Sequence, residues 1–582
     1  MGGIFVTLNT SNYPRPDFVR TDWNSLDGEW DFSLDTDILD KKINVPFAYQ
    51  CVLSGIGITE DHQCVWYRRT FSVDWEILAQ KRLLLKFGAV DYEARVFING
   101  AFAGSHLGGN TSFELDITAF VHPGENEVKL QALDGLETDK PRGKQSWTGE
   151  PFGCWYTPTT GIWQSVWLEY VGDTYLKRVK ITPKLDENLA ICEVFLSDNS
   201  SCAISVEAFS DSVRTPQQLY LGKQQFTCNN GYGKCVIAFP DMDHSRDRYI
   251  WFPDAPNLIY VNVEVASENG STDKVTTYFG MRSIQVINGQ FYLNGQLLYQ
   301  RLVLDQGYWP DSLLTPPNTQ AIIDDIRLTK EMGFNGARKH QKVEDPRYYY
   351  WADKMGLLVW GELPSCYMFN DNTVKKATRE MTEFVERDYN HPCIVTWVPM
   401  NESWGVRNVL TDTQQQAFCD ALLFLVKALD PTRPVSGNDG WEQTDRTDIM
   451  TLHDYALMPS SLHRYEDIHS ILNGCAESRS TLAKGHHYQG QPIVMSEYGG
   501  VAYDNHGEGW GYYNAAHTEQ EFLERITPIT EYLIKSGKFA GFCYTQLTDV
   551  MQEKNGLLDA QRRPKVATEK LRAVFAKRYF ED

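Results

Sequence analysis

Two glutamates, Glu402 and Glu497, each follow a short apolar run, in CIVTWVPMNE and PIVMSE. An apolar and aromatic neighbourhood raises the pKa of a carboxylic acid, as a proton donor to a departing oxygen requires, and Trp404 lies two residues from Glu402. A second, ionised carboxylate can attack an anomeric carbon, and retaining glycosidases hold the two carboxyl groups about 5 to 5.5 Å apart. The pair therefore predicts double displacement, with Glu402 as acid/base and Glu497 as nucleophile.

Either glutamate alone would more often be the partner of a salt bridge or the cap of a helix. Here two of them end apolar runs, with Asn401 before Glu402 and Tyr-Gly after Glu497. This combination favours the catalytic interpretation.

The elements that must position these glutamates begin near residue 284, where short apolar runs alternate with helical periods. In TQAIIDDIRLTKEMG, for example, Ile322, Ile326 and Met332 fall on one helix face and Gly333 ends it. Eight strand-helix units in about 300 residues are typical of a (β/α)8 TIM barrel. The predicted strands are 297–304, 334–340, 357–363, 393–400, 433–437, 448–455, 492–499 and 539–547.

Polar residues gather where these predicted strands end. Active sites of such barrels lie at the carboxyl ends of the strands, so these side chains should converge on one site. The candidates for substrate binding there are Asn401, Tyr455, Asp305, Arg338, His340, His453, Glu362, Trp404 and Gln546.

The chain before the barrel is rich in short alternating strands separated by turn residues. Residues 1–172 contain runs such as RLLLKFGAVDYEARVFING and predict an antiparallel β sandwich. Residues 173–283 repeat the pattern on a smaller scale and predict an immunoglobulin-like β sandwich. The expected organisation is thus two sandwiches followed by a barrel over 284–582.

Composition limits the partners of the protein. Acidic residues outnumber basic ones by 76 to 55, and the net charge of −21 repels nucleic acid and anionic membranes. The 16 Trp and 30 Tyr supply flat apolar faces with polar edges, which suit sugar rings. We expect a carbohydrate substrate, no nucleic acid and no membrane partner; a homo-oligomer is compatible with the sequence but not demonstrated by it.

The cysteines and the first residues bear on location. Twelve Cys occur without C-x-x-C pairs, so we predict neither a disulfide framework nor a zinc site. The start, MGGIFVTLNTSNYPRPDF, lacks a basic segment followed by an apolar run, and no run of about 18 apolar residues occurs. A cytoplasmic location is therefore expected.

Several segments of the chain resemble glycoside hydrolase family 2, which includes β-galactosidases, β-glucuronidases and β-mannosidases. The segments are NES at 401–403, SEYG at 496–499, GIWQSVWLE at 161–169, MGFNGARKH at 332–340 and ADKMGLLVWGELP at 352–364. The resemblance implies a jelly-roll sugar-binding domain, an immunoglobulin-like domain and a catalytic barrel. It also implies the same roles for Glu402 and Glu497.

The resemblance implies supporting roles for other residues. Asn401 resembles the residue that binds the sugar 2-hydroxyl, and Tyr455 and Arg338 resemble neighbours of the nucleophile. Asp305 corresponds to a substrate-contacting position. Asp134 or the loop 141–144 is expected to reach in from the first domain, whereas His340 and His453 could face the ligand or be structural.

Three departures from the family pattern bear on the substrate. Thr545 stands where family members carry a tryptophan beneath the sugar, so Trp309, Trp360 or Trp510 is the alternative stacking surface. No histidine stands two positions after Glu362, where magnesium-dependent members place a metal ligand, and we predict catalysis without a metal ion or other cofactor. The Asn-x-Lys motif that grips a glucuronide carboxylate is not reproduced in QEKNGLLDAQRRPK.

The leading hypothesis is a retaining exo-β-glycosidase that cleaves a terminal neutral sugar, with β-D-galactoside as the first guess. The alternatives within the family are a β-glucuronidase or galacturonidase, a β-mannosidase and an α-L-arabinosidase. The alternative outside enzymes is a carbohydrate-binding protein that has lost turnover.

Overall fold

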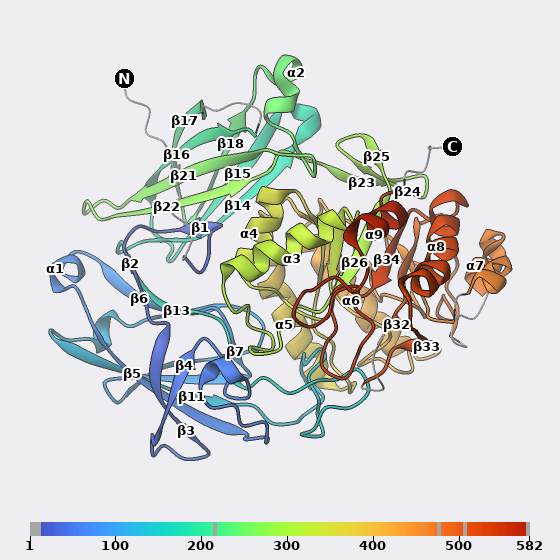
Figure 1. The fold of residues 1–582 in the computed structure, drawn as a ribbon. Helices are drawn as coiled ribbons and strands as arrows, with labels where there is room; N and C mark the ends of the chain where they lie inside the picture. The colour runs from blue at the N-terminus through green and yellow to red at the C-terminus, as the bar shows by residue number, and fades with distance from the viewer. Residues whose placement is uncertain (1–12, 214–217, 457, 474–478, 504–508, 578–582) are drawn as a thin grey trace.

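The computed structural model describes residues 13–213, 218–456, 458–473, 479–503 and 509–577. Two β sandwiches pack beside an α/β barrel (Figure 1). The first twelve residues, on which the expectation about a targeting segment partly rests, lie outside the described residues. Among the described residues, no helix is both long and apolar enough to cross a membrane.

The first sandwich packs a four-stranded sheet, in the order β10-β6-β13-β2, against a six-stranded sheet, β4-β3-β5-β11-β8-β9. Buried residues alternate along its strands, most regularly along β11, and Trp30 and Phe32 lie in its core. The elements are β2 (Trp23–Ser25), β3 (Gly28–Leu34), β4 (Lys41–Val45), β5 (Cys64–Ser72), α1 (Trp75–Leu78), β6 (Arg82–Phe87), β7 (Val90–Asp91), β8 (Glu93–Ile98), β9 (Ala101–Leu107), β10 (Phe113–Asp116), β11 (Glu125–Leu133), β12 (Gly161–Ile162) and β13 (Val166–Val171).

The second sandwich is smaller and joins a three-stranded sheet, β14-β15-β18, to a five-stranded sheet, β1-β22-β21-β16-β17. Its edge strand β1 comes from the start of the chain, where Phe18 pairs with Thr277. The elements are β1 (Phe18–Val19), β14 (Leu176–Lys184), β15 (Leu189–Leu196), β16 (Cys202–Asp211), β17 (Leu219–Cys228), β18 (Tyr232–Ala238), α2 (Met242–Ser245), β19 (Trp251–Phe252), β20 (Ala255–Pro256), β21 (Leu258–Ala266) and β22 (Thr272–Phe279).

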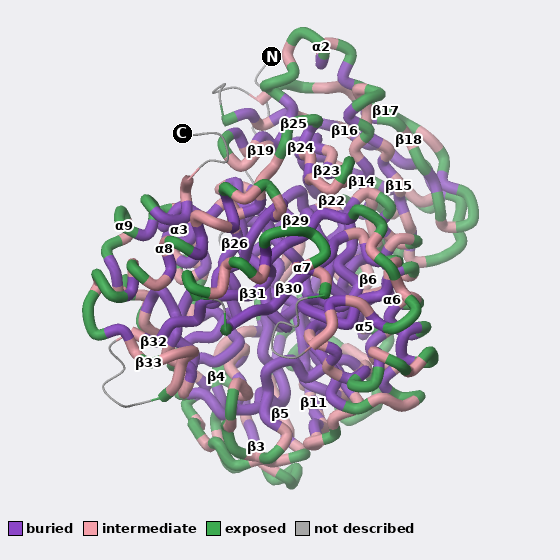
Figure 2. Tube along the Cα trace, turned by 90° about the vertical axis from the view of Figure 1, so that its right-hand side faces the viewer, coloured by how far each residue is buried: buried purple, intermediate pink, exposed green. Residues whose placement is uncertain are grey.

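The barrel is built from seven parallel strands in the order β29-β28-β27-β26-β34-β31-β30. These strands are buried along nearly their whole length at the centre of the molecule (Figure 2). They are β26 (Gln300–Asp305), β27 (Gly336–Lys339), β28 (Leu358–Glu362), β29 (Ile394–Val398), β30 (Met450–Asp454), β31 (Ile493–Gly499) and β34 (Gly541–Thr545). The barrel predicted from the sequence is therefore confirmed, with seven of its eight strands.

Helices and two small sheets complete this half of the chain. The helix predicted from TQAIIDDIRLTKEMG is confirmed: α3 has Asn318 as its N-cap and buries Ile322 and Ile326, while Met332 is buried at its end. The elements are β23 (Ile284–Ile287), β24 (Gln290–Leu293), β25 (Gln296–Leu298), α3 (Thr319–Glu331), α4 (Pro346–Met355), α5 (Asp371–Asp388), α6 (Thr413–Leu429), α7 (Ile468–Asn473), β32 (Val501–Tyr503), β33 (Tyr512–Ala516), α8 (Glu519–Lys535) and α9 (Thr568–Phe575).

The predicted fifth barrel strand, 433–437, is not a regular strand. Among the described residues, it pairs with β29 through one isolated bridge, between Trp397 and Val435. Pro434 has no N–H to donate, and the N–H groups of Val435 and Gly437 donate to the side chains of Asp448 and Thr447 instead of to a neighbouring strand. The segment still fills the gap between β29 and β30.

The first sandwich is docked on the barrel through the loop between β11 and β12. The backbone N–H of Arg142 donates to the carbonyl of Ser365, and the hydroxyl of Tyr367 donates to the carbonyl of Gly143. Gly143 has φ +60, and a Cβ there would lie 2.4 Å from the carbonyl oxygen of Gln341. Only glycine fits this approach, which brings the neighbouring Lys144 to the barrel.

Candidate active site

Arg338, fully buried at the end of β27, is the centre of the site. Its Nη1 donates to Oε1 of Glu497 at 2.8 Å, and its Nε donates to Oε2 of Glu362 at 2.7 Å. Its Nη2 donates to Oδ1 of Asn401 at 2.7 Å and lies 3.0 Å from Oδ2 of Asp439. One guanidinium thus holds side chains from several strand ends in fixed relative positions.

Glu497 lies within β31 and accepts hydrogen bonds at both oxygens. Besides Arg338 on Oε1, the Tyr455 hydroxyl donates to Oε2 at 2.5 Å. Nε2 of His453 is 3.5 Å from Oε1. These contacts hold both oxygens of Glu497 in fixed positions at the barrel mouth.

Glu402 follows β29 and faces Glu497. One oxygen of each carboxylate and one ring nitrogen of His453 all lie within 4.8 Å of one another. Glu402 and Ser403 both have left-handed backbones, with φ of +53 and +56. Such conformations cost energy in residues other than glycine and are found where the surrounding structure fixes a functional side chain.

The two carboxylates differ in their access to solvent and in their partners. The side chain of Glu402 is 16 % exposed and that of Glu497 is 5 % exposed. Oε1 of Glu402 is 2.8 Å from Nδ1 of His453, and Oε2 accepts from Nε1 of Trp404 at 3.1 Å. Glu402 is therefore the carboxylate that a departing group can reach from outside.

The electrostatics of Glu402 differ from the sequence prediction. Burial alone would raise the pKa of its carboxyl group, as expected beside Trp404, but the hydrogen bond and charge of His453 lower the pKa below its usual value. The prediction rested on residues close to Glu402 in the sequence, whereas His453 lies 51 residues further along the chain. In this arrangement Glu402 is ionised.

Asn401 offers a free donor beside the two glutamates. Its Oδ1 is occupied by Arg338, and within the described part of the chain its buried Nδ2 has no hydrogen-bond partner. A buried donor without a partner is costly, so a group of a bound molecule can satisfy it. This agrees with the predicted contact to a sugar hydroxyl, which itself stays a prediction.

Glu362 and His340 lie in the same network, behind the two glutamates. Burial raises the pKa of Glu362 to about 7, even though Arg338 opposes this shift. Nδ1 of His340 is 3.2 Å from Oε1 of Glu362, and burial together with the charge of Arg338 holds the pKa of His340 well below its usual value. His340 is therefore neutral.

The donor set of the site does not favour a metal ion. The oxygens of Glu362 accept from Nε of Arg338 and from the backbone N–H of Gln341. Glu402, His453 and Glu497 are close enough to ligate an ion. Burial lowers the pKa of His453, but the surrounding carboxylates outweigh burial and raise this pKa to about 10. A protonated ring is a cation and not a ligand.

Two predicted residues lie outside this network. Oδ2 of Asp305 accepts from Nζ of Lys339 at 2.8 Å, and the same ammonium also pairs with Glu344. Gln546 accepts from Gln306 and donates to Asn555. Among the described residues, neither bonds to Glu402 or Glu497, and their role in substrate binding stays a prediction.

Aromatic rings form one wall beside Glu402. Trp404 packs edge-on against Trp155, at 5.3 Å between ring centroids, and lies 5.3 Å from Tyr367. On the Glu497 side, Tyr512 stacks on Tyr455 at 3.6 Å with an interplanar angle of 4°. These rings come from both the first sandwich and the barrel, and the sequence analysis singled out only Trp404 and Tyr455 among them.

The three tryptophans proposed as a stacking surface lie in different surroundings. Trp360 is fully buried and donates to Oε1 of Gln300, and Trp309 lies beneath the cation of Lys342. Trp510 instead packs edge-on against Tyr512 at 5.4 Å. Of these three, only Trp510 adjoins the rings that line the site.

Lys144 reaches the site from the loop 141–144 of the first sandwich, as the sequence predicts. Its Nζ lies 5.8 Å from the ring of Trp155. Burial raises the pKa of Glu402, and the charge of Lys144 adds to the larger effect of His453 in lowering it. Asp134, the other candidate of this domain, pairs instead with Lys140 at 2.5 Å. Lys144 is thus a buried cation at the mouth of the barrel.

Asp439 is a buried carboxylate of this network that was not among the candidates predicted from the sequence. Its Oδ2 lies 2.8 Å from Nε2 of His453 and 3.0 Å from Nη2 of Arg338. It follows the predicted strand 433–437, so the rule that strand ends carry the site could have identified it. Despite its burial, the charge of Arg338 holds the pKa of Asp439 well below its usual value.

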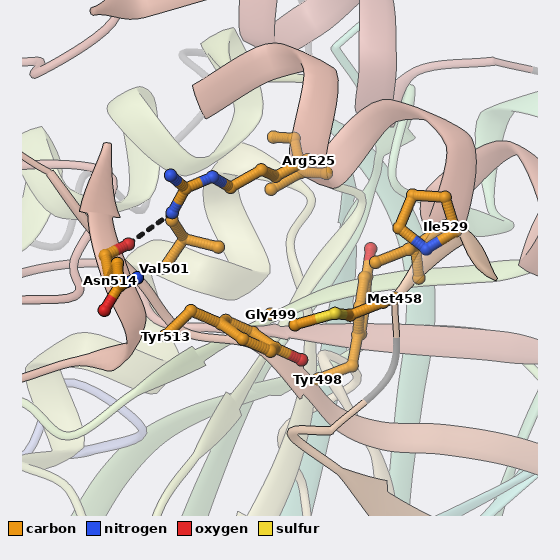
Figure 3. A pocket seen from close by; sticks show the side chains of 10 residues that line it. Met458, Tyr498, Gly499, Val501, Tyr513, Asn514, Arg525 and Ile529 are labelled. Carbon is orange, nitrogen blue, oxygen red and sulfur yellow. Dashed lines mark hydrogen bonds between the residues drawn. The ribbon is translucent and has the colours of Figure 1, made fainter. Parts of the chain in front are cut away.

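A separate cavity of about 510 Å³ lies beside the end of β31 (Figure 3). Tyr498 and Gly499, which follow the nucleophile candidate, line it together with side chains of α8 such as Ile529. Successive side chains of a strand point to opposite faces. The cavity therefore faces away from Glu497, and none of the candidate site residues lines it.

An N-terminal pair of sandwiches and a barrel with two facing glutamates define the scaffold of a multidomain glycoside hydrolase. Residues 284–579 match the TIM barrel domain of glycosyl hydrolases family 2, and residues 36–138 match the sugar binding domain of that family. The barrel match covers half of the chain, and the chain therefore belongs to glycosyl hydrolases family 2. The family predicted from the motifs is confirmed by these matches.

Curated relatives carry different activities in their names. The chain is 28% identical over 396 residues to a putative beta-glucuronidase of Formosa agariphila, and the aligned region covers 66% of this chain and 46% of that protein. It is 28% identical over 410 residues to a beta-galactosidase of Thermoanaerobacter pseudethanolicus, covering 68% and 51%. The chain thus spans about half the length of these relatives.

Solved structures share the fold over nearly the whole chain. A beta-D-glucuronidase of Dictyoglomus thermophilum has a TM-score of 0.76 at 19% identity and covers 97% of this chain and 98% of that one. A beta-galacturonidase of Eisenbergiella tayi has a TM-score of 0.75 at 19% identity, with 96% and 97% covered. At this identity the likeness establishes the fold alone.

Proposed function

We propose that the protein is a retaining exo-β-glycosidase that removes a terminal neutral sugar, with β-D-galactoside as the first substrate to test. The observation that carries the proposal is the separation of the two glutamates, whose nearest oxygens lie within 4.8 Å. Retaining enzymes hold their carboxyl groups about 5 to 5.5 Å apart, whereas inverting enzymes need about 6.5 Å or more to admit a water molecule. The short separation supports double displacement.

In the first half of the proposed reaction, an oxygen of Glu497 bonds to the anomeric carbon while the glycosidic C–O bond breaks. Glu402 gives a proton to the leaving oxygen, which departs as an alcohol. Arg338 and Tyr455 orient Glu497 for this attack, because each donates a hydrogen bond to one of its oxygens. The free donor of Asn401 is placed to bind a hydroxyl of the sugar.

In the second half, water replaces the enzyme at the anomeric carbon. Glu402, now ionised, takes a proton from the water as its oxygen bonds to that carbon and the ester bond to Glu497 breaks. Two displacements leave the configuration of the sugar unchanged. The aromatic wall of Trp155, Trp404 and Tyr367 covers the side from which the leaving group departs, and so supports binding of the aglycone there.

The test is a panel of nitrophenyl glycosides: β-galactoside, β-glucuronide, β-galacturonide, β-mannoside and α-L-arabinopyranoside. We expect the β-galactoside to be hydrolysed at least about tenfold faster than the uronides, because the binding of a neutral sugar does not require a carboxylate to be moved out of water. Hydrolysis of another neutral glycoside alone would keep the reaction and change the sugar. Inactivity of the intact protein across the panel would favour the carbohydrate-binding alternative.

A second candidate substrate is a β-uronide, and Lys144 is the observation that favours it. Its buried ammonium has one recorded hydrogen bond within the described residues, to Sγ of Cys154 at 3.4 Å, and no carboxylate oxygen of those residues lies within 4.0 Å. A buried cation without a close counter-ion fits an anionic group. Proteins of similar fold are named as acting on glucuronides and galacturonides.

If the substrate is a uronide, replacing Lys144 by Met should lower kcat/KM for it by about 100-fold, because a buried charge pair is lost. A 100-fold change corresponds to about 2.7 kcal/mol in the barrier. Lys144→Arg keeps the charge and serves as the matched control. The two variants should hydrolyse a neutral glycoside equally well. Equal losses on neutral and acidic glycosides would remove Lys144 from substrate recognition.

A further inference from the structure

The ring of His453 bridges two carboxylates. Its Nδ1 is 2.8 Å from Oε1 of Glu402, and its Nε2 is 2.8 Å from Oδ2 of Asp439. Both contacts are hydrogen-bonding distances between a ring nitrogen and an acceptor-only group. A neutral imidazole has a single N–H and can donate to only one of them, whereas the doubly protonated ring donates to both. With Glu402 and Asp439 both ionised, the imidazolium form is the one that donates to both carboxylates.

The groups facing this ring come from every neighbouring strand end. Glu402 follows β29, Asp439 follows the segment 433–437, and Glu497 in β31 lies 3.5 Å from Nε2. On β27, Arg338 bonds to Asp439 and to Glu497, and the neutral His340 lies alongside. Three carboxylates thus surround the ring against one guanidinium, and the balance favours a cation at His453.

The ring is fixed in place by its surroundings. Gly440 has φ +108, and a Cβ there would lie 2.7 Å from Nδ1 of His453, so only glycine lets the backbone approach the ring. The backbone N–H of Glu402 donates to the carbonyl of Asp439 at 2.8 Å. The ring and the two carboxylates it bridges are therefore held as one unit.

This arrangement leaves Glu402 without a proton of its own. Oε1 faces His453 and Oε2 accepts from Trp404 at 3.1 Å. Both oxygens therefore act as acceptors, which is the bonding pattern of a carboxylate. An acid/base residue must nevertheless hold a proton when the leaving group departs. The nearest proton is the one on Nδ1 of His453.

We propose that His453 stores the proton that Glu402 delivers to the leaving group, and that Asp439 holds the ring for this purpose. The inference rests on the proposed function and concerns how its acid/base step is supplied. His453 and Asp439 act through Glu402 and are positioning residues for the reaction. The three side chains of Glu402, His453 and Asp439 form a proton relay.

Protons and bonds balance over one catalytic turnover. The proton moves from Nδ1 of His453 to Glu402 and on to the glycosidic oxygen, while Glu497 bonds to the anomeric carbon and the alcohol departs. Water then adds its oxygen to the anomeric carbon as the bond to Glu497 breaks, and Glu402 takes the proton of this water and returns it to Nδ1. The net reaction is the addition of one water molecule across the glycosidic bond.

The test compares His453→Gln with the unchanged protein on two glycosides of the same sugar, one with an alkyl and one with a dinitrophenyl leaving group. The variant should lose about 100-fold in kcat/KM on the alkyl glycoside and less than about tenfold on the dinitrophenyl glycoside, because only a poor leaving group needs the proton. The alkaline limb of kcat/KM should move to lower pH by about one unit or more. His486→Gln, whose ring pairs with Asp445 away from the site, is the matched control.

Nitrogen NMR of histidine-labelled protein tests the same inference without turnover. The His453 ring, identified by its loss in His453→Gln and by its shift in Asp439→Asn, should be doubly protonated at pH 8 and become neutral there in Asp439→Asn. A neutral ring at pH 8 in the unchanged protein would overturn the relay, as would equal losses on both glycosides with an unmoved alkaline limb. An unchanged protein inactive on every glycoside, yet with the imidazolium signal, would instead refute the proposed function alone.

Discussion

Replacing Glu497 by Gln is expected to lower kcat by roughly four orders of magnitude or more on every glycoside that the protein hydrolyses, equivalent to about 5.4 kcal/mol in the barrier. The amide cannot form the glycosyl-enzyme ester, and no other carboxylate of the described residues bonds to both Arg338 and Tyr455. The measurement is steady-state hydrolysis of the best nitrophenyl glycoside of the panel.

The control for this variant is Glu264→Gln, which removes the same charge from an exposed position of β21. It should leave kcat within about twofold, since surface substitutions away from the site have small effects. Circular dichroism and thermal unfolding should show that both variants are folded. A rate for Glu497→Gln within about tenfold of the unchanged protein would exclude Glu497 as the nucleophile.

Replacing Glu402 by Ala should separate substrates by their leaving groups. General acid catalysis contributes about 100-fold to 10⁴-fold, so an alkyl or unsubstituted phenyl glycoside should lose at least about 1,000-fold in kcat/KM. A dinitrophenyl glycoside needs no proton on departure and should lose less than about tenfold in the first step. Measuring kcat/KM for both on the same preparation gives the comparison.

A second feature of Glu402→Ala follows from the space that it opens beside the anomeric carbon. Azide should raise kcat on the dinitrophenyl glycoside, because a small anion can replace the water that Glu402 no longer activates, and the product should be a β-glycosyl azide. Equal losses on both leaving groups, with no effect of azide, would argue that Glu402 has a structural role.

The sequence predicted the barrel and both glutamates because these depend on local patterns. Apolar strands such as β29 and β31 are buried along their length, and a polar residue that follows them must lie at the barrel mouth. The segment 433–437 was predicted as a strand for the same reason. The backbone N–H groups of Val435 and Gly437 are instead bonded to the side chains of Asp448 and Thr447, which no local pattern reveals.

The electrostatics of the site could not be predicted from local patterns. Trp404 suggested a raised pKa for Glu402, but the partner that decides the shift, His453, is brought there by a different strand. Asp439 was missed because it follows an irregular segment. Lys144 was among the candidates only as part of a loop, and its position depends on the docking of the first sandwich on the barrel.

The measurement that tests the central claim most directly is peptide mapping by mass spectrometry after incubation with a 2-deoxy-2-fluoro glycoside of the sugar that the panel identifies. Such a compound slows the second displacement more than the first when its leaving group is good, so the glycosyl-enzyme ester accumulates. We expect one fluorosugar per chain, bound to the peptide that contains Glu497. Inactivation with the label on another residue, or an α-configured first product from the unmodified glycoside, would contradict it.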